Sequence, residues 1–146
     1  MQLLQIHSEP EQNQLFMNYP DCAEILPMTL EFFEKVGYFP PWVGYFVKRD
    51  GELCGSAAFK GQPQNGQVEI AYGVFPKFRQ QGIGTEICRK LVELSLQTDP
   101  SVKVTARTLM EENYSTRILQ KNNFQFGGVV EDEEDGEVWE WVYVKL

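Results

Sequence analysis

A strand pattern, a glycine loop and a helix pattern follow one another between residues 68 and 98, and this order constrains the fold most. The run Val68–Val74 shows the alternation of a β-strand. From Ile83 onward, apolar residues recur at spacings of four, four and three, which places them on one face of a helix. The stretch therefore predicts a strand that leads through a short loop into an amphipathic helix.

The loop between that strand and that helix contains two glycines, Gly82 and Gly84. A helix start has unpaired backbone N–H groups and a positive potential, so a phosphate fits there when no side chain blocks it. Arg79 adds a positive charge and Thr85 adds a hydroxyl. The dinucleotide fingerprint requires a third glycine where Ile87 stands, and the Gly-Lys-Ser/Thr of a P-loop is absent. The pattern indicates either a phosphate loop of another kind or a simple turn.

The remaining patterns predict short strands and helices around this unit. Further strands are expected at residues 3–7, on both sides of the Asp50–Gly51 turn between 42 and 59, and at 102–109, 124–130 and 137–146, with two helical stretches within 15–36 and one at 114–123. Pro20 and Asp21 mark a helix start, and Pro27 predicts a break in the second helical stretch. The order of elements predicts a single α/β (α+β) domain over residues 1–146.

Charge is unevenly distributed along the chain, whose formal net charge is −8. Seven of the 21 acids lie between Glu131 and Glu140, whereas the stretch from Lys77 to Lys121 has eight basic residues and five acids. A basic middle and an acidic end suggest sites for ligands of opposite sign, although an acidic run is also typical of a solvated turn.

Three cysteines, Cys22, Cys54 and Cys88, are odd in number and lack metal-ligand spacing. We therefore expect buried structural thiols, with neither a disulfide framework nor a metal site. The beginning of the chain has no basic start or apolar run of signal-peptide length, and no window is apolar enough for a membrane span. These features predict a cytoplasmic protein without a membrane or nucleic-acid partner.

The segment RQQGIG at residues 79–84 resembles the Gln/Arg-x-x-Gly-x-Gly/Ala signature of the GCN5-related N-acetyltransferase (GNAT) superfamily. The element order over nearly the whole chain is similar to that of this family. The stretches VEIAYGVFPKFRQQGIGTE and NYSTRILQKNNF look like the branch of ribosomal-protein and other amino-terminal acetyltransferases. The resemblance implies a GNAT domain with a mixed, mostly antiparallel sheet of about seven strands flanked by about four helices, and acetyl-CoA as cosubstrate.

The resemblance also implies a set of cofactor-binding residues. Backbone amides around the loop would hold the pyrophosphate beside Arg79, Val74 would donate an N–H near the thioester carbonyl, and Asn113 would contact the pantetheine arm. The loop residues implied in this way are Gln80, Gly82, Ile83, Gly84 and Thr85. Alternatively, Val74 is an ordinary core strand residue, Thr85 is a solvated side chain and Asn113 is a helix cap.

Acetyl transfer to an amine requires a base, and Glu69 is the only acid within the central strand run. Alternation places Glu69 on the same face as Ala71 and Gly73, which leaves room for a ligand or a water. Partial burial would raise its pKa toward a useful value. The alternative is a structural ion pair with a neighbouring Lys or Arg.

The expected proton donor to the leaving thiolate departs from the family pattern. Many members have a tyrosine where Leu119 stands in this chain. Ser115 matches the serine that the ribosomal-protein branch uses, but it follows Asn113 by two residues instead of three. Ser115 is therefore a candidate catalytic residue or a helix N-cap, and Tyr72, Tyr114 or solvent could replace it.

The acceptor site is expected across the sheet from the cofactor, with the aromatic stretch FFEKVGYFPPW (residues 32–42) as a wall or as core. If the acidic run 131–137 faces this cleft, it favours a cationic acceptor such as a polyamine, an aminoglycoside or a basic protein N-terminus. The first hypothesis is thus an N-acetyltransferase, monomeric or homodimeric, for a small-molecule amine or a peptide N-terminus. The second is a catalytically weak acyl-CoA-binding sensor or interaction module with the same fold.

Overall fold

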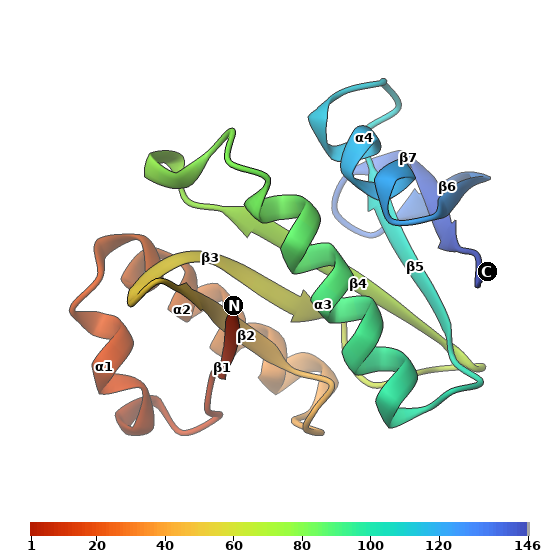
Figure 1. Cartoon of the computed structure of the whole chain (residues 1–146). Coiled ribbons are helices and arrows are strands. Elements are labelled where there is room, and N and C mark those ends of the chain that lie inside the picture. The colour runs from red at the N-terminus through yellow and green to blue at the C-terminus, as the bar shows by residue number, and fades with distance from the viewer. Residues whose placement is uncertain (146) are drawn as a thin grey trace.

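The computed structural model describes residues 1–145 and contains one seven-stranded sheet with strand order β1-β2-β3-β4-β5-β7-β6 (Figure 1). The strands are β1 (Gln2–Gln5), β2 (Gly44–Arg49), β3 (Glu52–Phe59), β4 (Gln67–Val74), β5 (Lys103–Thr108), β6 (Phe124–Asp132) and β7 (Gly136–Tyr143). The helices are α1 (Gln14–Met17), α2 (Pro20–Val36), α3 (Ile83–Thr98) and α4 (Tyr114–Lys121). Only β4 and β5 pair in parallel within these residues, so the predicted mixed, mostly antiparallel sheet is confirmed.

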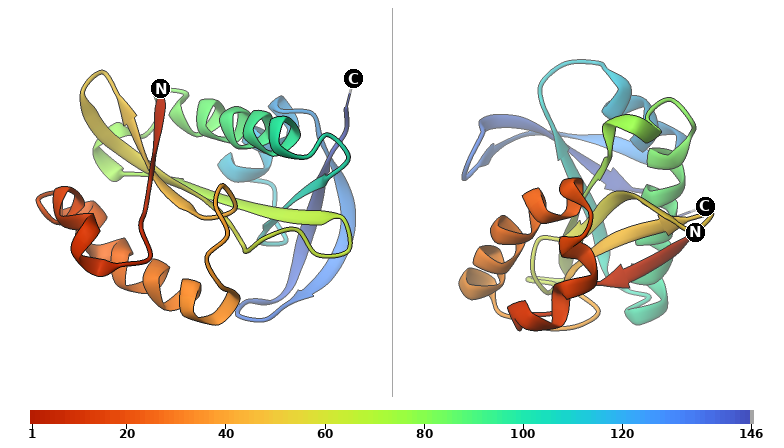
Figure 2. Two further views of the ribbon diagram at one scale, coloured as in Figure 1. Left: turned by 90° about the horizontal axis from the view of Figure 1, so that it is seen from below. Right: turned by 90° about the vertical axis from the view of Figure 1, so that its left-hand side faces the viewer.

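Helices cover both faces of the sheet. Helices α1 and α2 lie on one face, and α3 and α4 lie on the other (Figure 2). Three of the four apolar side chains that predicted α3, Ile83, Ile87 and Leu91, are at most 1% exposed and join Val68 and Ile70 of β4 in the core. Burial of each such side chain contributes roughly 1.5–3 kcal/mol. Packing of this one helical face therefore fixes the glycine loop relative to the sheet.

Helix α2 is continuous through Pro27, so the predicted break is wrong. Proline removes one backbone hydrogen bond, which is costly where water cannot replace it. Pro27 lies on the exposed side of α2, whereas Cys22, Leu26 and Phe33 are buried on the other side. Burial of that inner face keeps the helix intact. The predicted start at Pro20 is confirmed, with Tyr19 as N-cap.

Another local prediction, the turn at Asp50–Gly51, is confirmed by backbone angles. Asp50 and Gly51 have φ values of 52° and 80° between β2 and β3, as the two central residues of a type I′ hairpin turn require. Asn123, directly before β6, adopts φ 67°, a left-handed angle that asparagine tolerates. The first strand ends at Gln5, before its predicted limit.

The predicted burial of the thiols is also confirmed. All three cysteines are free and buried: Cys22, Cys54 and Cys88. Within residues 1–145, no helix is both long enough and apolar enough to cross a membrane.

Strands β4 and β5 separate before β4 ends. Their pairing runs only from Gln67–Lys103 to Ile70–Ala106, whereas β4 remains paired with β3 as far as Val74. Phe75 donates its N–H to Cys54 of β3, and alternate residues of an antiparallel strand point their backbone groups to opposite sides. The backbone groups of Tyr72 and Val74 therefore point toward β5, beyond the last β4–β5 pair.

Candidate functional site

A cavity of about 450 Å³ opens where β4 and β5 separate, on the face covered by α3 and α4. We call it the α3–α4 cavity. The end of β4, the loop before α3 and the first turns of α3 and α4 line it. Its lining residues are Tyr72, Gly73, Val74, Arg79, Gln80, Gly84, Tyr114, Ser115, Arg117 and Ile118. The structure thus brings together five residues that the sequence analysis selected: Val74, Arg79, Gln80, Gly84 and Ser115.

The loop before α3 presents backbone N–H groups at the helix start. Gly82 is the N-cap in a left-handed conformation (φ 75°), and Gln80 also has a positive φ of 65°. Glu86 is the first residue to donate inside the helix, to the Gly82 carbonyl at 3.2 Å. The N–H groups of Ile83, Gly84 and Thr85 precede the helical ladder and are available to an anion.

The two glycines of the loop differ in what they permit. A Cβ atom on Gly82 would meet nothing within 4 Å, so Gly82 is required by its backbone angle. A Cβ atom on Gly84 would lie 2.7 Å from Ile118 Cδ1, so Gly84 also allows α4 to pack against α3. Ile83 is buried in the core, and the Thr85 carbonyl accepts a hydrogen bond from Asn122. Of Ile83 and Thr85, only the backbone N–H groups are therefore available to a ligand in the cavity.

The start of α4 supplies the other wall of the α3–α4 cavity. Asn113 is the N-cap: its side chain accepts from the Thr116 N–H at 3.1 Å, and Thr116 Oγ1 accepts from the Asn113 N–H at 2.9 Å. The alternative of Asn113 as a helix cap is therefore confirmed, whereas Ser115 as N-cap is wrong. Ser115 is exposed in the first turn of α4 and lines the cavity. Leu119 is 1% exposed and belongs to the core.

One residue of this cavity, Arg117, extends the sequence prediction, and the two tyrosines proposed as replacements for Ser115 also line it. Arg117 lines the cavity two residues after Ser115. In the sequence it was recognisable only as one basic residue within the predicted helix 114–123. Tyr72 also lines the cavity, and burial followed by the neighbouring Cys88 thiol raises the pKa of its hydroxyl. Tyr114 is 46% exposed at the rim.

A second cavity, of about 400 Å³, lies on the opposite face of the sheet, beside α2. We call it the acidic cavity because five carboxylates and two basic side chains line it. These charged residues are Glu69, Asp132, Glu133, Glu134, Glu140, Lys60 and Arg107. The predicted aromatic wall is represented by Phe32 alone among the lining residues, with the Lys60 ammonium 5.4 Å from its ring centre, while Phe33 is core. The acidic run does face the cleft opposite the glycine loop.

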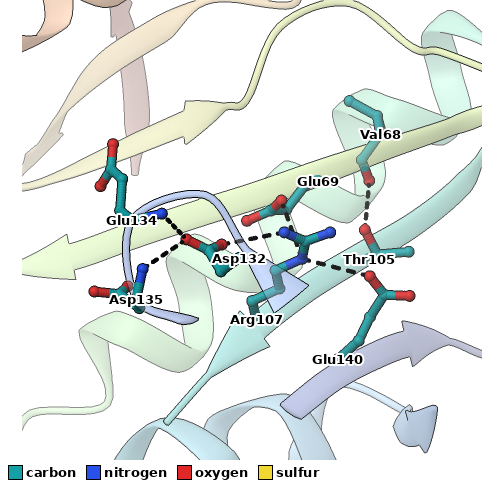
Figure 3. Close-up of polar contacts among 8 residues, drawn as sticks. All are labelled: Val68, Glu69, Thr105, Arg107, Asp132, Glu134, Asp135 and Glu140. Atoms are coloured by element: carbon teal, nitrogen blue, oxygen red, sulfur yellow. Dashed lines mark hydrogen bonds and ion pairs between the residues drawn. The ribbon is translucent and has the colours of Figure 1, made fainter. Parts of the chain in front are cut away.

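Arg107 lies at the centre of the acidic cavity, among three carboxylates (Figure 3). Its Nε atom is 3.6 Å from Glu69 and 3.5 Å from Glu140, and its Nη1 atom donates to Asp132 at 3.1 Å. Burial raises the pKa of Glu69, partly offset by Arg107 and Lys60. The direction of this shift is the predicted one, but Glu69 also has the cationic neighbour of the alternative prediction.

Asp132 links the acidic turn to the sheet. One carboxylate oxygen accepts from the N–H groups of Glu134 and Asp135 at 2.9 and 3.2 Å, and the other accepts from Arg107 (Figure 3). These hydrogen bonds, chiefly the one from Glu134, lower the pKa of Asp132. The turn between β6 and β7 is therefore held over the cavity as a charged, ordered rim.

The two cavities offer complementary chemistry on either side of β4. The α3–α4 cavity combines unpaired helix N–H groups with two arginines and suits an anionic ligand with a phosphate. The acidic cavity combines carboxylates with one aromatic ring and suits a cation. Among residues 1–145 there is no group of three or more His, Cys, Asp or Glu side chains arranged to hold a metal ion.

Comparison with protein families gives a match to the Acetyltransferase (GNAT) domain over residues 1–125. An uncharacterized N-acetyltransferase of Bacillus subtilis (strain 168), YjdG, is 27% identical over 129 residues, which cover 78% of this chain and 73% of that protein. These matches agree with the resemblance found in the sequence.

Solved structures with the same fold include two acetyltransferases. RimL, a ribosomal L7/L12 alpha-N-protein acetyltransferase in complex with coenzyme A, has 16% identity, a TM-score of 0.69 and coverage of 97% of this chain and 92% of its own. A mutant of the spermidine N-acetyltransferase SpeG from Vibrio cholerae has 11% identity, a TM-score of 0.72 and coverage of 99% and 95%. The predicted fold is thus confirmed over nearly the whole chain.

Proposed function

This chain belongs to the acetyltransferase (GNAT) family, and we propose that it transfers the acetyl group of acetyl-CoA to a cationic primary amine by direct attack. The observation that carries this proposal is the α3–α4 cavity, where unpaired helix N–H groups and the unpaired backbone of Val74 lie together. In the proposed ternary complex, acetyl-CoA occupies this cavity and the amine approaches from the acidic cavity.

The cofactor's pyrophosphate would lie at the start of α3. The N–H groups of Ile83, Gly84 and Thr85 are available there, and the positive end of the helix favours a negative charge. Arg79 and Arg117 flank the opening and can pair with phosphate oxygens. The presence of coenzyme A in the RimL structure, which shares this fold, supports the assignment.

The acetyl carbonyl would lie in the gap between β4 and β5. The amine nitrogen attacks the carbonyl carbon, the carbonyl oxygen becomes an oxyanion, and the carbon–sulfur bond then breaks to release the CoA thiolate. The Val74 N–H points into the gap and would donate to the oxyanion. One such donor accelerates acyl transfer by about 10²–10³-fold in other enzymes.

Ser115 is the proposed proton donor to the thiolate, because its side chain lies in the α3–α4 cavity at the first turn of α4. Tyr114, at the exposed rim, could act in its place. Tyr72 is a third candidate donor, and burial raises the pKa of its hydroxyl, which makes it a weaker acid than an ordinary tyrosine.

Glu69 is the proposed base. It must be ionised to accept the proton of the ammonium group, so activity should be lost as the pH falls through its raised pKa. Gly73 precedes Val74 at the proposed acetyl site and lies four residue steps along the extended strand from Glu69, about 13 Å between Cα atoms. The proton therefore passes through water along the strand face, past the small side chain of Ala71.

A cationic acceptor is supported by the charge of the acidic cavity, with five carboxylates against two cations. The SpeG enzyme, which shares the fold, is a spermidine N-acetyltransferase. RimL acts on a ribosomal protein N-terminus, so a basic peptide is the other acceptor class to test. Like charges in the cavity would repel an acidic acceptor and lower its rate of association.

Buried Leu119, which takes the place of the usual catalytic tyrosine, favours a second candidate function: a weakly catalytic acyl-CoA-binding module. Release of CoA thiol from acetyl-CoA, measured with polyamines, aminoglycosides, basic peptides and acidic amines, separates the two. We expect turnover with polyamines or other cationic amines. Absence of turnover with every acceptor, despite micromolar cofactor binding by calorimetry, would favour the module. Absence of cofactor binding would refute both.

A further inference from the structure

The guanidinium of Arg107 carries one positive charge and lies among three carboxylates. Glu69 comes from β4, Glu140 from β7 and Asp132 from the end of β6, and each side chain is only 20–21% exposed (Figure 3). Partial burial weakens the screening of their mutual repulsion. One cation from β5 therefore lies among carboxylates from three other strands.

The Nε–H group of Arg107 is not committed to either neighbour. Carboxylate oxygens of Glu69 and Glu140 lie 3.6 and 3.5 Å from it, beyond hydrogen-bond length. Among residues 1–145 this buried nitrogen has no hydrogen-bond partner. A small rotation of the side chain would complete a bond to one acid or to the other, so Glu69 and Glu140 compete for the same donor.

From this geometry we propose that Arg107 is a positioning residue that keeps Glu69 as an oriented carboxylate in the acidic cavity, through an Nε–H group shared with Glu140. This inference rests on the proposed role of Glu69 as base. The charged groups that face Glu69 are Arg107 from β5, Lys60 after β3, Glu140 from β7 and Asp132 at the end of β6.

These neighbours predict opposite effects on the ionisation of Glu69. Arg107 is the largest influence that lowers the pKa of Glu69 against its burial, whereas Asp132 and Glu140 raise it. Loss of Arg107 would leave three carboxylates close together, and Glu69 would take up a proton at a higher pH. Loss of the Glu140 charge would leave the Nε–H to Glu69 and extend its ionised range to lower pH.

The test uses four variants of the full chain: Arg107→Met, Arg107→Lys, Glu140→Gln and Asp132→Asn. Arg89→Met is the matched control, because Arg89 lies on the exposed face of α3 and pairs only with Glu93 in the described structure. The readouts are kcat/KM between pH 5.5 and 9 with the best acceptor, and NMR titration of ¹³C-labelled glutamate carboxyls. The titration needs no turnover, with Glu69→Gln identifying the signal.

For Arg107→Met we expect kcat/KM to fall about tenfold at pH 6 and less than about twofold at pH 8.5, with the Glu69 titration moved to higher pH. Arg107→Lys should restore most of the profile, and Glu140→Gln should move the titration to lower pH. Asp132→Asn also weakens the contact between Arg107 and the turn, but it removes a negative charge. It should therefore not reproduce the upward movement seen with Arg107→Met.

Identical profiles for Arg107→Met and Asp132→Asn would overturn the proposal, because they would show that Arg107 only docks the turn. An unchanged Glu69 titration in Arg107→Met would also overturn it. If Arg107→Met does not fold, Glu140→Gln carries the decision: movement of the Glu69 titration to lower pH supports the proposal, and no movement overturns it. Failure of the proposed function is recognised separately, as wild-type protein without turnover.

Discussion

The α3–α4 cavity and the acidic cavity are built by different means. The first is lined by residues from one stretch of the chain, between 72 and 84, and by the start of α4. The second is formed by charged side chains from the loop after β3, from β4, β5 and β7, and from the turn after β6. One depends on local chain geometry, and the other on the assembly of distant segments.

This difference teaches how each cavity should respond to change. Backbone N–H groups at a helix start carry no titratable proton, so the α3–α4 cavity should bind its ligand over a wide pH range. The acidic cavity should respond strongly to pH and salt, because its charges are partly exposed and share Arg107. Cofactor binding and acceptor turnover should therefore be separable by mutation.

Glu69→Gln should give the largest effect, and it should impair turnover at the acidic cavity while cofactor binding in the α3–α4 cavity is retained. Removing a general base lowers turnover by about 10²–10⁴-fold. Loss of activity at low pH, which follows protonation of Glu69, should also disappear from the residual pH–rate profile. Stopped-assay kinetics and calorimetry with coenzyme A check this. The matched control is Glu137→Gln, since Glu137 is an exposed residue of β7. An unaltered profile would remove Glu69 as base.

Gly82→Val should instead weaken coenzyme A binding in the α3–α4 cavity. A β-branched residue is strained at φ 75°, and its side chain would stand before the N–H groups of α3. Loss of charge-assisted hydrogen bonds of about 1.5–3 kcal/mol corresponds to a roughly thirtyfold lower affinity for coenzyme A. Gly66→Val is the control, since Gly66 has φ 74° and equally open surroundings in the loop before β4. Equal affinities in the two variants would contradict the phosphate site.

The double change Glu133→Gln with Glu134→Gln should weaken binding of a cationic acceptor at the acidic cavity. Exposed ion pairs contribute about 0.2–1 kcal/mol each, so KM for a diamine should rise roughly fivefold at low salt. The effect should shrink at high salt, while affinity for coenzyme A stays constant. The control is Glu131→Gln with Glu137→Gln, two charges of the same hairpin that lie outside the cavity lining. The same KM in both double variants would argue against an acceptor at this turn.

Asn113→Ala should have the smallest effect on function. Loss of an N-cap lowers the free energy of unfolding by about 1 kcal/mol, which thermal unfolding can measure. Thr116→Val weakens the same capping box but keeps the Asn113 side chain. If Asn113 acts only as a cap, both variants should bind coenzyme A equally. A tenfold loss of affinity confined to Asn113→Ala would instead support contact with the pantetheine arm.

Much of the fold could be predicted because the decisive signals are local. The alternation in β4, the 3–4 periodicity of α3 and the turn at Asp50–Gly51 each report the conformation of a few neighbouring residues. Pro27 misled for the same reason: its local cost is real, but burial of the opposite face of α2 outweighs it. Both Asn113 and Ser115 were candidate caps of α4, and only the structure selects Asn113, because which residue caps a helix depends on where the first turn begins.

The sequence by itself determined the helix start after Gly82, the strand that leads into it and the position of Glu69 on the face of Ala71. These follow from backbone geometry over short distances. Only the tertiary structure decided that Arg107 lies among Glu69, Asp132 and Glu140. Residues 69 and 140 are far apart in the chain, and their charges interact only because β4, β5 and β7 are adjacent in the sheet. Electrostatic coupling depends on distance in space, which no local pattern encodes.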